Sequence, residues 1–218
     1  MFIEFRDKNN QFYQKYLRSF AARSSVSSVN LEEQEEDFET SLAINAHLDA
    51  YDYVFSNFID VDISIYDLPS LITILTDGNI TNFRNINIMV SGSSCLRTKP
   101  YLIRQELFAL FKEVNELKLL ISDPFLREAI FHIKFLKIHP FEDGNGRCAR
   151  LLSCFNLCKN DIPPFVIPRN RKEEYCNYIE NNDYDGLAQM FKELSKLELS
   201  IMLDIYKKSD QIIKSTSR

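Results

Sequence analysis

Residues 139–150 restrict the fold of this chain more than any other stretch. They read His-Pro-Phe-Glu-Asp-Gly-Asn-Gly-Arg-Cys-Ala-Arg and hold two of the only five glycines in 218 residues. A helix is predicted before them, over about 123–138, and another from Arg147 onward, where apolar residues recur with helical spacing. The glycines therefore form a turn between two helices, and this turn lies at the N-terminus of the second helix.

The residue types in this segment suit polyphosphate chemistry. A glycine turn lets backbone N–H groups approach an anion, and the free N–H groups and dipole of a helix N-terminus favour phosphate. Arg147 and Arg150 are three apart and so point to the same side of their helix, where two forked cations can hold adjacent phosphates. Asp143 is placed to hold a magnesium ion that bridges phosphate oxygens. His139, with an ordinary pKa of about 6.5, can accept a proton near neutral pH.

The segment resembles the signature of the Fic family, His-x-Phe-x-(Asp/Glu)-Gly-Asn-Gly-Arg-x-x-Arg, at every defined position. Most members of that family transfer AMP from ATP to protein hydroxyls, and the relative that transfers phosphate has Lys where this chain has Gly146. The resemblance implies an AMP transferase that uses ATP and Mg²⁺, with His139 as the base and Asp143 as the metal ligand. It assigns ATP phosphate binding to Gly144, Asn145, Gly146, Arg147 and Arg150.

The resemblance also implies an adenine side and a surface that binds the target. Family members use a Tyr in an Arg-x-x-x-Tyr segment, which Tyr175 matches, and an Asn about seven residues further on, for which Asn182 is the candidate. Packing roles for these two residues remain equally open. A flap in the family pairs with an extended segment of the target, and residues 82–91 alternate apolar and polar residues, with Ile86 and Ile88 on one face. We therefore expect a small β-hairpin there that docks the target.

Many Fic proteins carry an inhibitory helix, (Ser/Thr)-x-x-x-Glu-(Gly/Asn), whose Glu pairs with the second motif arginine. The Ser-rich stretch of this chain fits the pattern in neither register. Starting from Ser24 puts Ser28 where the Glu belongs, and starting from Ser28 puts Glu32 there but follows it with Glu33. We therefore expect that this stretch inhibits the site incompletely, which we call an incomplete lock, and that the chain has basal activity without a partner. The stretch fits equally well as the capped start of a helix with an acidic face and no regulatory role.

The predicted fold is all-α, a Fic-type helical bundle with the small β-hairpin as a flap. Residues 1–218 are expected to form one Fic domain, with N-terminal helices over 1–58, a catalytic core over about 60–190 and a C-terminal helix over about 184–213. The candidate inhibitory segment spans residues 24–33. Helices are predicted over about 8–22, 39–58, 66–76, 100–119, 123–138, 171–181 and 184–213, and in the motif helix.

Composition excludes several other classes of protein. A net charge of −5 without a basic stripe argues against nucleic acid as the main partner. The sequence has no apolar run of membrane-spanning length and no signal peptide, so we expect no membrane and a cytoplasmic location, with delivery into a host cell left open. Cys154 and Cys158 could form half a metal site, but further ligands are absent nearby, so buried thiols are favoured. His47 and His132 are expected to be packing residues.

Three activities remain open on the sequence alone. The first is AMP transfer to a Ser, Thr or Tyr hydroxyl of a target protein, including the chain itself. The second is a hydrolase that removes AMP with water as the nucleophile, and the third is a catalytically idle Fic-like interaction module. Residues that bind phosphate do not select the nucleobase, so transfer of another nucleotide also stays open. The target protein and the oligomeric state stay open too.

Overall fold

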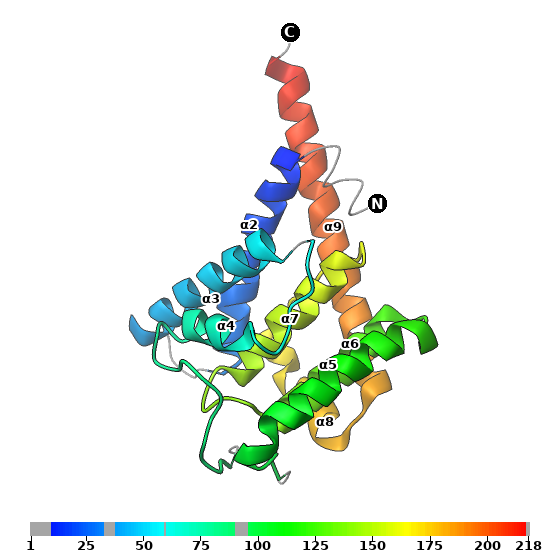
Figure 1. The fold of residues 1–218 in the computed structure, drawn as a ribbon. Helices are drawn as coiled ribbons and strands as arrows, with labels where there is room; N and C mark the ends of the chain where they lie inside the picture. Colours follow the sequence, from blue (N-terminus) through cyan, green and yellow to red (C-terminus); the bar gives the residue numbers. More distant parts are fainter. Residues whose placement is uncertain (1–9, 33–37, 59, 90–95, 217–218) are drawn as a thin grey trace.

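The computed structural model describes residues 10–32, 38–58, 60–89 and 96–216, and these contain helices and loops but no strand. The all-α prediction is therefore confirmed (Figure 1). The α-helices are α2 (Asn10–Asn30), α3 (Phe38–Asn57), α4 (Leu68–Leu75), α5 (Ile103–Leu120), α6 (Pro124–Ile138), α7 (Asn145–Lys159), α8 (Lys172–Asn181) and α9 (Tyr184–Thr216). Two short 3₁₀ turns, Pro100–Leu102 and Arg169–Arg171, precede α5 and α8.

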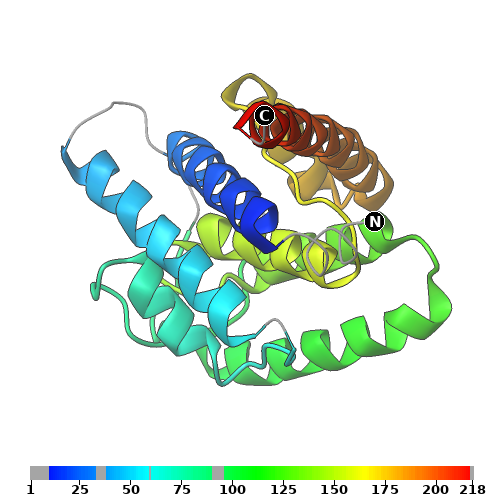
Figure 2. The same cartoon turned by 90° about the horizontal axis from the view of Figure 1, so that it is seen from above.

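Helix α7 runs through the middle of the bundle (Figures 1 and 2). It packs against α2, α3, α4 and α6, and 12 of its 15 residues are buried. A helix that is covered on all sides is stabilised by packing around its whole circumference, whereas a surface helix packs through one face only. The glycine turn at its N-terminus is therefore fixed by several neighbouring helices.

The turn before α7 is built from left-handed backbone positions. Helix α6 ends before His139, which has a φ of +52°, and Pro140 follows it. Gly144, with a φ of +76°, precedes the first residue of α7. A left-handed φ costs a glycine little, whereas at His139 it is an uncommon conformation that the surroundings must maintain. This strained residue is the predicted base.

The predicted β-hairpin at 82–91 is wrong for residues 82–89, which form an irregular loop; residues 90 and 91 lie outside the described part. Arg84 gives the physical reason. Its guanidinium donates to the carbonyl of Ile86, which a strand ladder in the predicted hairpin would otherwise use, and to the carbonyl of Thr98 beyond it. A buried side chain thus joins the two limbs of the loop. Ile86 is half exposed and Ile88 partly buried, and their role in docking a target remains a prediction.

The first described helix is longer than its apolar pattern predicts. A helix was expected to end near residue 22, yet α2 continues through the serines to Asn30. Ser24 lies 2.7 Å from the Tyr51 hydroxyl, oxygen to oxygen, and Ser28 is buried against α7. Small hydroxyl side chains permit this close helix packing and receive hydrogen bonds in return, so the serines extend the helix instead of interrupting it.

The long helix α9 packs along α6, and its C-terminal part projects beyond the other helices in Figure 1. None of the described helices is both long and apolar enough to cross a membrane. Cys148, Cys154 and Cys158 are buried as free thiols. The described residues contain no group of three or more His, Cys, Asp or Glu side chains that could hold a metal.

Candidate active site

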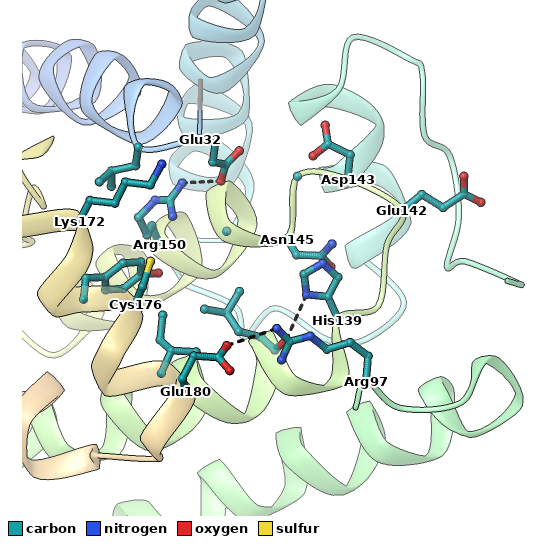
Figure 3. Close-up of a pocket in the computed structure, with 16 residues that line it drawn as sticks. Glu32, Arg97, His139, Glu142, Asp143, Asn145, Arg150, Lys172, Cys176 and Glu180 are labelled. Carbon is teal, nitrogen blue, oxygen red and sulfur yellow. Dashed lines mark hydrogen bonds and ion pairs between the residues drawn. The ribbon is translucent and has the colours of Figure 1, made fainter. Parts of the chain in front are cut away.

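A pocket of about 320 Å³ opens where the C-terminus of α6, the N-terminus of α7 and one face of α8 meet (Figure 3). It brings together side chains from distant parts of the sequence. The predicted residues that line it are Glu32, His139, Asp143, Gly144, Asn145, Gly146, Arg150 and Tyr175. Most of the site predicted from the sequence therefore lies around one cavity.

His139 faces this pocket with one ring nitrogen already engaged. Its Nδ1 lies 3.1 Å from the Leu136 carbonyl oxygen, which can only accept, so Nδ1 carries the proton and Nε2 is the free base. The pKa of His139 is lowered to about 4, chiefly by burial and also by the positive charges of Arg97 and Arg84, against the opposing effects of the Leu136 hydrogen bond and of Asp143. The imidazole is therefore neutral at physiological pH and ready to accept a proton.

Asn145 holds the turn in shape. Its side-chain oxygen accepts from the Phe141 N–H at 3.0 Å, and its side-chain nitrogen donates to the Phe141 carbonyl at 2.9 Å. The first N–H groups of α7 have no partner inside the helix and remain available for an anion. The buried Asn145 side chain is thus used within the protein, where it fixes the shape of the glycine turn.

Both motif arginines are buried and both contact Glu32, which follows α2. Arg147 Nε lies 3.0 Å from one Glu32 carboxylate oxygen, and Arg150 Nη2 lies 2.6 Å from the other. The prediction that the two arginines point to the same side of α7 is confirmed. Gly146 makes this approach possible, because a Cβ there would lie 2.5 Å from the Glu32 carboxylate.

These contacts show which register of the N-terminal pattern reaches the motif arginines, while inhibition by this segment remains a prediction. The structure has the second register, in which Ser28 and Glu32 both contact Arg150. Arg150 Nε donates to Ser28 Oγ at 2.7 Å, and Arg150 Nη2 donates to the Ser28 carbonyl at 3.0 Å. Turn hydrogen bonds after Asn30 bring the carboxylate over α7. Residue 33 lies outside the described residues, and basal activity remains a prediction.

Asp143 lies at the mouth of the pocket, with a side chain that is 69% exposed and one oxygen 2.7 Å from Arg147 Nη2. Mg²⁺ in nucleotide sites is commonly held by one or two carboxylates together with phosphate oxygens and water. An exposed carboxylate beside the phosphate turn fits that kind of site. Glu142, its exposed neighbour, also lines the pocket and forms no hydrogen bond or ion pair with the residues that the structure describes.

The adenine side differs from the expectation in part. Tyr175 lines the pocket but is buried, and its hydroxyl lies 2.6 Å from His132 Nε2. Asn182 is an exposed residue that ends α8 in a left-handed conformation, and it is not among the pocket residues. Lys172, Cys176, Ile179 and Glu180 of α8 line the wall instead.

Sequence reasoning missed two arginines near the base. Arg97 lines the pocket and pairs with Glu180 at 3.6 Å across its lower end in Figure 3. Arg84 is buried and donates to the carbonyls of Ile138 and His139, at 3.2 Å and 2.7 Å. Arg84 thereby caps the C-terminus of α6 and supports the left-handed His139. Neither residue belongs to a local motif, so only a three-dimensional structure could reveal these roles.

Comparison with known proteins identifies the family. Residues 63–157 match the model of the Fic/DOC family. These residues belong to the Fic/DOC family. The structure is similar to a Fic domain containing signalling protein from Bacteroides thetaiotaomicron, with a TM-score of 0.80 and 17% identity over 91% of this chain and 92% of that one. It is also similar to Fic-1 from Caenorhabditis elegans, with a TM-score of 0.72 and 18% identity over 96% of this chain and 71% of that one.

Curated relatives match the Fic domain over shorter stretches. "Protein adenylyltransferase fic-1" of Caenorhabditis elegans is 37% identical over 76 residues, which are 35% of this chain and 15% of that protein. "Protein adenylyltransferase Fic" of Drosophila melanogaster is 40% identical over 52 residues, 24% of this chain and 11% of that protein. The chain thus matches only a small part of these relatives' length.

Proposed function

We propose that this Fic domain transfers AMP from ATP to a hydroxyl group of a protein. The observation that carries the proposal is that one pocket holds both a neutral histidine, with its proton on Nδ1, and a glycine turn at a helix N-terminus beside Arg150. The names of the curated relatives, which are protein adenylyltransferases, support the same activity.

In the proposed reaction the chain positions charge and accepts one proton. The N–H groups at the start of α7 bind the α-phosphate, while Arg147 and Arg150 bind the outer phosphates in the place that Glu32 occupies. His139 Nε2 takes the proton of a Ser, Thr or Tyr hydroxyl as its oxygen bonds to the α-phosphorus, and pyrophosphate leaves. Asp143 would hold Mg²⁺, which neutralises charge on the phosphates.

The test of this function is label transfer from ATP to protein. The full chain and its Glu32→Gly variant are incubated with Mg²⁺ and either α-labelled or γ-labelled ATP, and labelled protein is counted after denaturation. Protein should take up the α label only, in the chain itself or in an added target, and uptake should stop in a chelator. Uptake of the γ label, or no α label with either protein and several added targets, would disprove AMP transfer.

A second function, removal of AMP from a modified protein, is favoured by one observation. Glu32 lines the same pocket as His139, so a carboxylate is present that could orient an attacking water. Protein carrying labelled AMP, supplied without ATP, separates the two functions. Release of AMP by the wild type and its loss in Glu32→Gly would identify the hydrolase.

Removing Arg150 is expected to weaken ATP binding. A hydrogen bond to a charged group contributes about 1.5–3 kcal/mol, so Arg150→Ala should raise the Kd for ATP roughly ten- to a hundredfold. Calorimetry is best done in the Glu32→Gly background, so that the carboxylate does not compete. Lys112→Ala, which removes an equal charge from the exposed face of α5, is the control and should bind ATP normally. Unchanged ATP affinity in Arg150→Ala would rule out phosphate binding by Arg150.

We further propose that residues 1–218 act as one Fic domain in the cytoplasm. A continuous core that includes residues from α2 to α9 supports a single unit, and the four free thiols among the described residues suit a reducing compartment. Self-modification is part of the proposal because it needs no other protein, whereas assembly into oligomers is left to measurement.

A further inference from the structure

A second cavity, of about 180 Å³, lies between α5, α6, the C-terminal half of α7 and the loop after α3. No described residue lines both this cavity and the pocket around His139. Glu128, one of the α6 residues of the cavity, precedes His139 by 11 positions, which corresponds to roughly 16 Å along a helix. The cavity is therefore a separate site on the same two helices that carry His139 and the motif arginines.

Glu128 contributes a buried carboxyl group with only one partner to the wall of this cavity. The residue is 5% exposed, and its Oε2 accepts from Asn156 Nδ2 at 3.1 Å. Its Oε1 has no hydrogen-bond donor among the residues that the structure describes. Burial raises the pKa of Glu128 to about 8, so the group is mostly protonated at pH 7 when no cation is beside it. A buried carboxyl group of this kind requires either a proton or a cation.

The basic side chains around the cavity do not supply that cation. Lys159 Nζ donates to Asp62 at 2.8 Å and to a backbone carbonyl at 2.7 Å. Arg127, the neighbour of Glu128 on α6, donates to two backbone carbonyls that precede the helix. Lys118 of α5 is exposed and forms no hydrogen bond or ion pair with the described residues. Glu128 is therefore either protonated or open to a cation from outside the chain.

The rest of the wall suits an organic cation. Phe111, Phe131 and Phe155 line it together with aliphatic side chains. The face of an aromatic ring attracts an ammonium group within about 6 Å, and Lys159 Nζ already lies 5.7 Å from the centre of the Phe155 ring. At roughly 30 Å³ per water molecule, the cavity has room for about six non-hydrogen atoms. An ammonium group on a chain of about five carbons has that size.

We propose that this cavity binds a small primary ammonium compound, with its ammonium group on Glu128 and its hydrocarbon chain against the three phenylalanines. The ammonium group donates to Oε1, while Asn156 keeps its hydrogen bond to Oε2. Binding exchanges the proton of Glu128 for the cation, so one proton passes to the solvent. The site does not depend on the proposed function, because neither ATP nor the motif arginines take part.

The test uses n-pentylammonium as the probe and n-pentanol as its neutral match of equal size. Calorimetry on the full chain should show that the amine binds and that the alcohol binds at least about tenfold more weakly, since only the amine forms a charged hydrogen bond. No binding of the amine, or equal binding of amine and alcohol, would overturn the proposal.

A pair of matched variants assigns the binding to Glu128. Glu128→Gln keeps an oxygen that accepts from Asn156 and removes the charge, so its affinity for the amine should fall at least about tenfold. Glu116→Gln, which removes an equal charge from the exposed face of α5 outside the cavity, should bind the amine like the wild type. Equal affinities in the two variants would show that the amine binds elsewhere.

The exchange of a proton for the cation is tested in the wild type, where no variant can misfold. A group with a pKa of about 8 is about nine-tenths protonated at pH 7 and about one-tenth at pH 9, while an alkyl ammonium stays charged at both. The affinity for the amine should therefore rise roughly tenfold from pH 7 to pH 9. At pH 7, binding heats in two buffers of different ionisation enthalpy should show nearly one proton released per amine bound.

Other charged groups surround Glu128, and the glutamine variant separates their effect. They are Lys118 of α5, Arg127 of α6, Lys159 of α7 and Asp62 of the loop after α3. The same tenfold rise in Glu128→Gln would assign the pH dependence to one of these groups and overturn the exchange. An affinity that falls from pH 7 to pH 9 would mean that a protonated Glu128 donates to a neutral ligand, which also contradicts the proposal.

Discussion

Glu32→Gly should increase α-label uptake by the chain about ten- to a hundredfold over the wild type. Glu32 accepts a hydrogen bond from Arg150, forms an ion pair with Arg147, and occupies the place proposed for the outer phosphates. Each hydrogen bond to a charged group contributes about 1.5–3 kcal/mol, and each 1.4 kcal/mol changes an equilibrium constant tenfold. The expected increase in label uptake lies at the low end of that range, because the Glu32 side chain is 29% exposed and its charge is therefore screened by solvent.

Two control variants separate the effect of losing the Glu32 carboxylate from the effect of a less stable fold. Glu32→Gln keeps the shape of the side chain and removes its charge, so it should activate nearly as well as the glycine variant. Glu113→Gln, which breaks a surface pair with Lys134 on α5 and α6, should leave the rate unchanged. A wild type that already labels itself as fast as Glu32→Gly would mean that the carboxylate does not compete with ATP.

The contact between Glu32 and the motif arginines could not be predicted from the family pattern, because the pattern specifies residue identities and the contact depends on how far the side chain reaches. The residue after Glu32, Glu33, departs from the family pattern, and the sequence on that ground predicts an incomplete inhibitory contact. What permits the contact is the absence of a side chain at Gly146 on the opposite helix, together with the turn after Asn30. Neither could be read from the Ser-rich stretch itself.

The helical bundle and the glycine turn of the motif could be predicted because both depend on residues that are close together in the sequence. Apolar spacing predicts the helices, and the two glycines of the motif predict the turn that precedes α7. The roles of Arg84, Arg97 and Glu180 could not be predicted, because each acts across many residues of sequence. The hairpin prediction failed because the buried Arg84 guanidinium takes the carbonyl of Ile86 and joins it to the carbonyl of Thr98, a residue beyond the predicted hairpin.

His139→Ala should abolish label transfer, by about 10²–10⁴-fold, while ATP affinity stays the same. The reason is that His139 is assigned to the proton and not to the nucleotide. His139 has a left-handed φ of +52°, so alanine there adds backbone strain that could reduce activity by itself. His139→Asn is the cleaner variant, because asparagine tolerates that conformation and lacks the base. Transfer at a near wild-type rate in either variant would show that another group takes the proton.

The pH dependence gives an independent check on the same residue. The base works when it is deprotonated, and burial with two nearby arginines lowers the pKa of His139 to about 4. Transfer measured as kcat/KM, which reports the free enzyme, should therefore stay level as pH falls from 8 to about 5.5 and decline only near pH 4. Bound phosphates add negative charge and favour the imidazolium, so the decline in kcat should lie at a higher pH than the decline in kcat/KM. The Glu32→Gly variant suits this measurement because its rate is not limited by the carboxylate. A decline in kcat/KM centred near pH 6.5 would mean that His139 is solvated like a free histidine and is not held as the structure has it.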